Sequence, residues 1–466
     1  MKAINSIIIA GKEVLPLVEG GKGISASNGI SSGAWAVAGG IGTFSAAYAD
    51  SYNNENQFIP ITYCTKTRKE RHNELLSYSI QAGISQAKIA YDIAGKNGLV
   101  NMNVLWGMAE IEKMLHGILE KAKGIIHGIT CGAGMPFKLA EIAEKYKVYY
   151  YPIVSSARAF EILWRRAYNK FSKWLGAIVY EDPWKAGGHN GLSKAENPQK
   201  PEAPYNRVRL LRKTMRKYDL DNIPIIIAGG VWFLREWQDW IDNNELGPIM
   251  FQFGTRPLLT QESPIPMKWK KRLLTLKKGD VILNHFSPTG YYSSAVKNSF
   301  LIKLQERSSR QIPYSSTIQG EYNTPFSINE RGRIFYLKNE DIQHAKAWFD
   351  NGASRVTITP DSTLIFLTHD EFNELRKDQN DCSGCLKYCR FSGWVESDDI
   401  KVDKVIPDFR SYCIQKTLRS IAHGGDIENN LMFAGNNTYL FSQEPFYEKG
   451  FIPTVKQLVE RILAGN

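Results

Sequence analysis

Short apolar segments alternate with helical segments along the first part of this 466-residue chain. The clearest unit is residues 223–255, where an almost continuous apolar run at 223–227 precedes a pair of glycines and a second run follows at 249–253. Runs of this kind are typical of strands that are buried on both faces of a parallel sheet. About eight such strands, with helices between them, favour closure into a barrel. The sequence therefore predicts an α/β protein built on a (β/α)8 TIM barrel.

The expected strands share a short apolar run, and several are followed at once by glycine. They lie at residues 14–18, 39–44, 99–104, 124–129, 148–154, 177–180, 223–227 and 249–253. Amphipathic helical patterns separate them, and the longest of these covers residues 68–94. After the seventh strand, tryptophans and phenylalanine recur at helical spacing at residues 232–240.

The character of the chain changes after residue 263. Residues 301–425 hold shorter mixed segments, several turn clusters and four of the six cysteines. An apolar segment resumes at 431–435, and residues 453–463 form a good closing helix. We therefore predict a barrel over residues 1–300, a mixed α+β insertion or lid over 301–425, and a segment over 426–466 that returns to the barrel.

Composition restricts the class of partner and the compartment. The net charge of +11 favours anionic partners. The densest basic run, at 268–278, has the pattern of a solvated amphipathic helix, and no RNA motif or zinc-finger spacing supports nucleic-acid binding. No stretch approaches transmembrane length and no signal peptide is recognisable. Six cysteines without an export signal favour a reducing cytoplasm, so we expect a cytoplasmic protein.

Glycines follow the seventh and eighth expected strands. Ala228-Gly229-Gly230 ends one strand, and Gly254-Thr255 ends the next. Bare backbone N–H groups at such turns can bind a phosphate, and the phosphate of a nucleotide cofactor usually lies in these loops of a barrel. The alternative is that the glycines only form tight turns. The absence of a G-x-G-x-x-G pattern favours a mononucleotide.

Two further segments are candidates for contacts with a planar ligand. Gly20-Gly21-Lys22-Gly23 follows the first strand, where backbone without side chains can lie flat against such a ligand, although a flexible turn would have the same composition. Asn103 ends the third strand. Its amide can reach cofactor carbonyls, or it can cap the next helix.

One histidine stands where barrel enzymes carry their catalytic groups. His189 follows Gly188 after the sixth strand. An imidazole with a pKa near neutrality can remove a proton from carbon, although a lone histidine is more often structural. We interpret His189 as the catalytic residue.

The cysteines of the insertion form a possible metal site. Cys382, Cys385 and Cys389 have the spacing C-x2-C-x3-C, and Cys413 follows. Thiolates at such spacing can converge on zinc or an iron–sulfur cluster. The alternative is a set of reduced cysteines that pack a small subdomain.

These segments together resemble a known family. The similar motifs are PLVEGGKGIS at 16–25, AGGIGT at 38–43, CGAGMP at 131–136, AGGH at 186–189, IAGG at 227–230 with Gly254-Thr255, and NNTY at 436–439. In this order they resemble the flavin-dependent nitronate monooxygenases, formerly called 2-nitropropane dioxygenases, and the related flavin-type enoyl-ACP reductases. The resemblance covers roughly residues 10–300 and 410–466.

The resemblance implies an FMN-dependent oxidoreductase that oxidises alkyl nitronates with dioxygen to a carbonyl compound and nitrite. An alternative is an NAD(P)H-dependent enoyl reductase for acyl chains on an acyl carrier protein, whose acidic surface the positive charge would suit. A third is a flavin-binding partner module without catalysis. The chain also departs from the family pattern: Glu19 and Lys22 replace the usual Gln and Met, and FSPTG at 286–290 is unusual. These departures concern the substrate.

Overall fold

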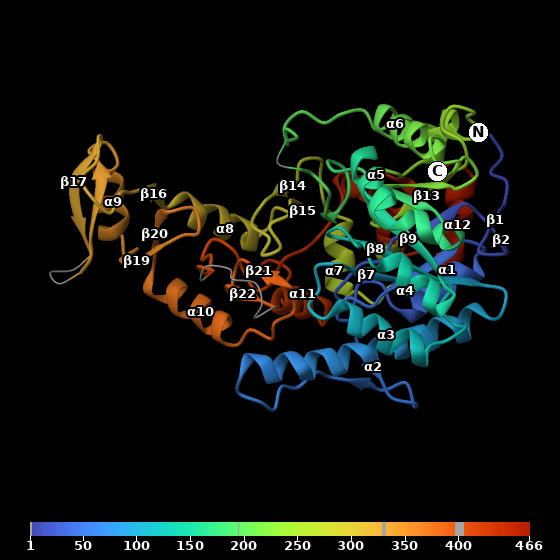
Figure 1. Ribbon diagram of the computed structural model, residues 1–466, viewed down its shortest axis with the longest axis horizontal. Helices are drawn as coiled ribbons and strands as arrows, with labels where there is room; N and C mark the ends of the chain where they lie inside the picture. The colour runs from blue at the N-terminus through green and yellow to red at the C-terminus, as the bar shows by residue number, and fades with distance from the viewer. Residues whose placement is uncertain (1, 194, 329–331, 397–404) are drawn as a thin grey trace.

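The computed structural model describes residues 2–193, 195–328, 332–396 and 405–466. A closed barrel of eight parallel strands forms its centre, with helices around it (Figure 1). The barrel strands follow one another in chain order: β3 (Leu17–Glu19), β4 (Ile41–Ser45), β7 (Leu99–Leu105), β8 (Gly128–Gly132), β9 (Tyr149–Val154), β10 (Ile178–Glu181), β12 (Ile225–Ala228) and β13 (Ile249–Phe253). β13 pairs with β3 and closes the ring. The predicted TIM barrel is confirmed.

The helices between these strands lie on the outside of the barrel (Figure 1). They are α1 (Gly29–Val37), α2 (Arg68–Ala94), α3 (Ile111–Lys121), α4 (Leu139–Tyr146), α5 (Ala157–Arg166), α6 (Pro204–Arg216) and the closing α12 (Val455–Leu463), with the 3-10 helix η1 (Tyr168–Trp174) after α5. The helical pattern after the seventh strand forms a 3-10 helix, η2 (Leu234–Trp240). Trp237 and Trp240 eclipse at this pitch and pack edge to face, with ring centroids 4.8 Å apart.

One end of the barrel is closed by apolar side chains. The hairpin of β1 (Ile7–Ile9) and β2 (Lys12–Val14) packs Ile9 and Val14 against the barrel interior. The interior cluster also contains inward-facing residues of successive strands, among them Val18, Ile41, Leu99, Tyr151, Val179, Ile226 and Met250. The carboxyl ends of the strands remain free to form a site, as in other barrels of this kind.

Smaller elements surround those carboxyl ends. β5 (Ser51–Tyr52) and β6 (Phe58–Ile59) form a short hairpin. β11 (Gly188–His189) pairs with β15 (Ser293–Val296), which pairs with β14 (Val281–Asn284). The short helices of this region are η3 (Arg256–Leu259), α7 (Met267–Leu273), η4 (Asn436–Ser442) and η5 (Pro445–Gly450). Among the described residues, none of the helices has the length and apolar character that a membrane span requires.

The segment that was expected to form one lid divides into two parts. After α8 (Ser299–Ser309) a small subdomain extends away from the barrel (Figure 1). It has a hydrophobic core of its own, which includes Phe326, Leu337 and Phe366. Its elements are β16 (Gln311–Pro313), β17 (Tyr322–Ser327), β18 (Ile334–Lys338), α9 (Ile342–Asp350), β19 (Arg355–Ile358) and β20 (Thr363–Leu367).

The chain then runs back along α10 (His369–Asn380) to the barrel. β21 (Tyr388–Cys389), β22 (Trp394–Val395) and α11 (Ile414–Ala422) follow. Side chains of this stretch, including Cys385 and Leu418, belong to the main hydrophobic core around the barrel. The cysteine-containing part therefore packs with the barrel, while the described residues of 311–328 and 332–367 stand apart.

Candidate functional site

A cavity of about 500 Å³ lies at the carboxyl ends of the barrel strands. A smaller pocket of about 100 Å³ adjoins it beside β12 and β13. The residues that line both are Gly21, Lys22, Glu181, Gly187, Gly254, Thr255 and Gly435. The two spaces therefore form one continuous site with a wide part and a narrow part.

Every residue that was predicted to bind the cofactor lines this site. The wide cavity is lined by Gly21, Lys22, Gly23, Asn103 and Gly188, together with the predicted catalytic His189. The narrow pocket is lined by Gly20, Ala228, Gly229, Gly230, Gly254 and Thr255. Residues from the ends of five different barrel strands thus meet in one place, which isolated tight turns would not require.

Three of the loops that line the narrow pocket are linked by hydrogen bonds. Gly229 and Gly230 have φ values of +90° and +81°, which favour glycine. Asn437 donates its amide to the Gly230 carbonyl at 2.8 Å, and the Gly435 N–H donates to Thr255 Oγ1 at 3.3 Å. The loop at 435–437, which the NNTY motif partly covers, therefore holds the two glycine turns together.

The absence of a side chain has a different structural consequence at Gly21 and at Gly254. A Cβ on Gly21 would lie 2.3 Å from the Asn103 Cβ, so close packing excludes a side chain there. A Cβ on Gly254 would meet no atom within 4 Å. Because Gly254 lines both spaces, its missing side chain leaves room for a ligand where the wide and narrow parts join.

The charged residues in the first loop form an ion pair. Lys22 Nζ lies 3.5 Å from Glu19 Oε1 and donates to the Gly20 carbonyl at 2.5 Å. Ser31 also donates to Glu19 Oε1, at 3.0 Å. Burial raises the pKa of Glu19, and the Lys22 charge opposes that shift. Glu19 and Lys22, the two residues that depart from the family pattern, therefore form an ion pair, and Lys22 lines the cavity.

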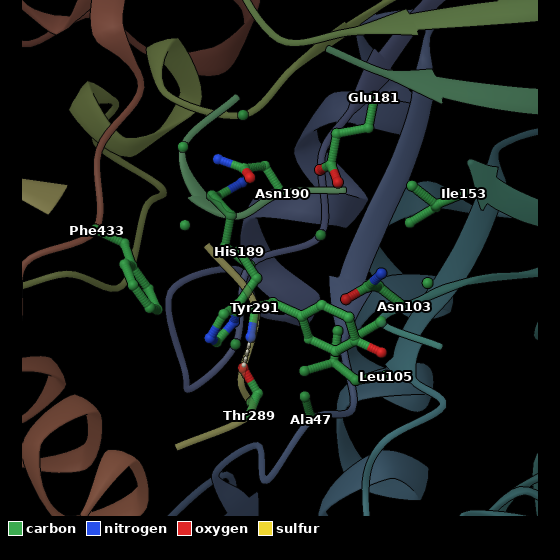
Figure 2. Close-up of a pocket in the computed structure, with 18 of the residues that line it drawn as sticks. Ala47, Asn103, Leu105, Ile153, Glu181, His189, Asn190, Thr289, Tyr291 and Phe433 are labelled. Carbon is green, nitrogen blue, oxygen red and sulfur yellow. Dashed lines mark hydrogen bonds between the residues drawn. The ribbon is translucent and has the colours of Figure 1, made fainter. Parts of the chain in front are cut away.

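Asn103 points into the wide cavity (Figure 2). Its Nδ2 donates to Thr130 Oγ1 at 3.1 Å, which fixes the amide across neighbouring strands. The N-cap of the next helix, α3, is Glu110. The alternative role of Asn103 as the cap of that helix is therefore wrong.

His189 lies in β11 at the wall of the cavity (Figure 2). Its Nε2 is 2.6 Å from Ser287 Oγ, and Ser287 Oγ is 2.8 Å from Thr289 Oγ1. The ring also packs edge to face on Phe433, with centroids 5.3 Å apart. Burial lowers the pKa of His189 to about 4, so the imidazole is neutral at pH 7 and is a weaker base than a free imidazole. Ser287 and Thr289 fix its orientation.

Sequence reasoning did not assign Ser287 and Thr289 to the site. Their segment, FSPTG at 286–290, was identified as a departure from the family pattern that concerns the substrate, and neither residue was given a role. Ser287 is 98 residues from His189, and the pairing of β11 with β15 brings the two segments together. No local pattern encodes that contact.

We expect Ser287→Ala to lower turnover by roughly tenfold or less, because the variant loses one hydrogen bond that orients His189. Steady-state rates on a neutral nitroalkane measure this effect. Bound flavin and thermal stability should stay close to wild type. A loss as large as that of a His189 variant would show that Ser287 itself acts on the substrate.

Glu181 is a second group that the sequence did not single out. It ends β10 and lines both parts of the site, and its carboxyl group points into the cavity (Figure 2). Burial, followed by the nearby charge of Asp182, raises the pKa of Glu181 to about 8. The carboxyl group is therefore mostly protonated at pH 7 and can donate a proton. Its position at the carboxyl end of the sixth barrel strand was the available signal.

The segment that contains the cysteines forms one wall of the cavity. The Lys387 N–H donates to the Gly107 carbonyl at 2.9 Å, and the Ala109 N–H donates to the Cys385 carbonyl at 3.2 Å. The lining side chains from this part of the chain are Cys385, Leu386, Ile414, Gln415 and Leu418. The returning segment therefore covers the site.

The four cysteines do not form a metal site in this structure. Among the described residues, which include Cys382, Cys385, Cys389 and Cys413, no three or more His, Cys, Asp or Glu side chains are placed to hold a metal ion. Cys382 Sγ instead donates to Ser392 Oγ at 3.3 Å and accepts from the Gly384 N–H at 3.4 Å. Burial raises the pKa of the Cys413 thiol to about 12, and also raises that of Cys385. The predicted zinc or iron–sulfur site is not supported.

We expect the protein to be purified with these four cysteines as free thiols without a bound metal, because the described residues bring no three metal-binding side chains together and burial disfavours the thiolate of Cys385 and of Cys413. Elemental analysis of the untagged protein after anaerobic purification measures this. One equivalent of zinc, or iron with acid-labile sulfide, would contradict the expectation.

Comparison with known proteins gives a family for this site. The chain matches the family described as nitronate monooxygenase over residues 12–465. It belongs to the nitronate monooxygenase family. The family uses flavin for oxidoreductase chemistry, so the protein is a flavin-dependent oxidoreductase. No curated protein matches the chain.

Solved structures agree on the fold of this family member. A nitroalkane oxidase from Streptomyces ansochromogenes is 13% identical, with a TM-score of 0.52 over 97% of this chain and 95% of that one. The enoyl reductase domain of MlnA from the macrolactin biosynthesis cluster of Bacillus amyloliquefaciens is 14% identical, with a TM-score of 0.50 over 97% and 93%. FabK from Thermotoga maritima is 15% identical, with a TM-score of 0.48 over 97% and 92%. At these identities the first two structures show the fold alone, and the third, with a TM-score under 0.5, supports no conclusion.

The residues of the site fit a flavin. The open face of Gly254 provides space without a side chain at the junction of the wide and narrow parts, and glycine turns surround the narrow part. The wide part has apolar walls and a neutral imidazole beside them. A phosphate suits the narrow part, and a large planar ring suits the wide part.

Proposed function

We propose that the protein is an FMN-dependent oxidoreductase that converts alkyl nitronates and dioxygen into carbonyl compounds and nitrite. With one dioxygen for every two nitronates, the atoms balance as two carbonyl compounds and two nitrite ions. The observation that carries the proposal is the His189 imidazole at the cavity wall, hydrogen-bonded to Ser287, which would form the nitronate in the site by taking a proton from the neutral nitroalkane. Flavin, when bound, supplies the electron acceptor and the reaction with dioxygen.

Different residues of the site would bind the cofactor and transfer the proton. Gly229, Gly230 and Gly254 would hold the FMN phosphate through backbone groups, and Asn103 would contact the ring. With Nε2–H donating to Ser287, which orients the ring, His189 would accept the acidic proton next to a nitro group at Nδ1, the other ring nitrogen. The wall formed by Leu386 and Leu418 would exclude water from that proton transfer.

A second function is supported by the cavity walls and by Glu181. Apolar side chains line the wide part, among them Leu105, Met108, Ile153, Leu163, Leu386 and Leu418. A small nitronate does not need so extensive an apolar surface, whereas an acyl chain does. The protonated Glu181 could also donate the proton that completes reduction of a double bond. The alternative is therefore an NAD(P)H-dependent enoyl reductase for carrier-bound acyl chains.

Anaerobic reduction of the bound flavin separates these functions. Rapid bleaching of the flavin spectrum by a pre-formed nitronate, and not by NADPH, would support the first proposal. Reduction by NADPH followed by reoxidation with an enoyl thioester would support the alternative. Reduction by neither compound would favour a flavin-binding module without catalysis. Adding an acyl carrier protein thioester beside the free thioester would test the acidic partner.

A further inference from the structure

Two lysines line the narrow pocket, and they differ in their charge partners. Lys22 is paired with Glu19 at 3.5 Å and also donates to a backbone carbonyl. Lys185 also lines the pocket, but among the described residues no carboxylate lies within 4.0 Å of its ammonium group. In the same loop region, Glu196 already pairs with Arg207 at 2.6 Å. Lys185 is therefore the cation of this pocket that lacks a counter-ion.

The surrounding chain fixes the position of Lys185. Asp182 Oδ1 accepts the N–H groups of Trp184 and Lys185, each at 3.0 Å, so the turn after β10 is held by the carboxylate. The Asn436 N–H donates to the Lys185 carbonyl at 3.5 Å. The side chain runs over Gly230, because a Cβ on that glycine would lie 2.6 Å from Lys185 Cδ. The glycine leaves the space that the lysine stem occupies.

This arrangement leaves a positive charge beside an anion-sized space. Lys185 is half-buried, and a cation that is partly removed from water is costly unless an opposite charge compensates it. Asp182 interacts electrostatically with Lys185, but its Oδ1 accepts two backbone N–H groups and neither of its oxygens lies within 4.0 Å of the ammonium group. An anion in the narrow pocket would supply the missing charge. Lysine binds phosphate well as a point charge.

We propose that Lys185 is the counter-ion of the FMN phosphate and selects FMN over riboflavin, which has the same ring and ribityl chain but no phosphate. The inference rests on the proposed use of FMN. It adds a residue outside the glycine motifs, from the loop between β10 and β11, and it assigns that residue to cofactor specificity. Lys22 is not equivalent, since its charge is already balanced by Glu19.

The test compares two flavins on the full chain. Flavin is removed, and the apoprotein is titrated with FMN and with riboflavin while flavin fluorescence is followed, at low and at high ionic strength. For Lys185→Met we expect FMN affinity to fall by roughly 10- to 100-fold, as for loss of a charge-assisted hydrogen bond. Riboflavin affinity should stay within about threefold of wild type, since only the phosphate contact is lost. Salt should weaken FMN binding to wild type more than to the variant.

Two further variants complete the test. Lys200→Met removes an exposed lysine of the following loop and should leave both affinities unchanged. Lys185→Arg keeps the charge and should retain a preference for FMN. Riboflavin binding also shows whether Lys185→Met is folded.

The outcomes distinguish failure of this inference from failure of the proposed function. An unchanged FMN-to-riboflavin ratio in Lys185→Met would overturn the role of Lys185 while leaving the flavin site intact. An equal loss of both affinities would overturn it as well, because the lysine would then only shape the loop. A wild-type protein that binds neither flavin would overturn both the inference and the proposed function.

Discussion

His189→Ala is expected to lower turnover of a neutral nitroalkane by roughly 10²- to 10⁴-fold, the range typical for loss of a general base. The imidazole lies at the cavity wall with its Nε2 held by Ser287 at 2.6 Å, and its lowered pKa keeps it neutral at pH 7. Activity on a pre-formed nitronate should fall much less, because the proton has already left that substrate. Steady-state rates on the two substrates, at matched flavin content, measure the difference.

The contrast between the two substrates is the decisive control. A structural role for His189 would lower both rates together, and so would a role in substrate positioning. Flavin content should be unchanged, since His189 is not among the groups that line the narrow pocket. Equal losses on nitroalkane and nitronate would therefore remove the assignment of His189 as a base.

The same histidine predicts a pH dependence of stability. Its pKa in the folded protein is about 4, below the ordinary value of 6.5. Between these values the unfolded chain binds more protons than the folded protein, so the free energy of unfolding rises with pH across this window and falls on acidification. His189→Ala should flatten that part of the profile, which urea denaturation at several pH values measures. A profile that kept its slope would show that other groups cause it.

The barrel was predictable because buried parallel strands have a strong signature. All eight expected apolar runs contribute a barrel strand, and β13 has the predicted bounds. The fourth run differs from its strand: residues 124–126 are apolar or glycine, but the strand starts at Gly128. Gly124 has a φ of +81° and forms a turn, so the apolar residues that follow it lie in this turn or directly after it and not in a paired strand.

The glycine-rich parts of the site were predictable for a related reason. Glycines at strand ends have local causes, such as a positive φ at Gly229, and those causes leave a pattern in the sequence. Ser287 and Lys185 leave no such pattern, and Glu181 has only its position at the end of a strand as a signal. Their roles depend on which distant segments meet, as β11 meets β15, and on burial that changes a pKa. The cysteine spacing brings the four thiols near one another, but it does not give the geometry that a metal requires.

The second large effect is expected at Gly254. Gly254→Asp should empty the flavin site, because its carboxylate would stand at the junction of the two parts and repel a phosphate. The protein itself should tolerate the change, since a Cβ at this position meets no atom within 4 Å. Gly230 is a poorer choice for this test. Its φ of +81° and the contact of a Cβ with Lys185 would add strain to any loss of binding.

Absorbance of the purified protein measures the flavin content of Gly254→Asp, and thermal denaturation of the apoprotein measures its stability. We expect FMN affinity to fall by more than about 100-fold, which corresponds to at least 2.7 kcal/mol of lost binding free energy. Gly254→Ala is the matched control for size without charge and should lose less. An apoprotein of wild-type stability that binds no flavin would place the cofactor against Gly254. Full flavin occupancy in Gly254→Asp would mean that the phosphate lies elsewhere, and the narrow pocket would lose its assigned role.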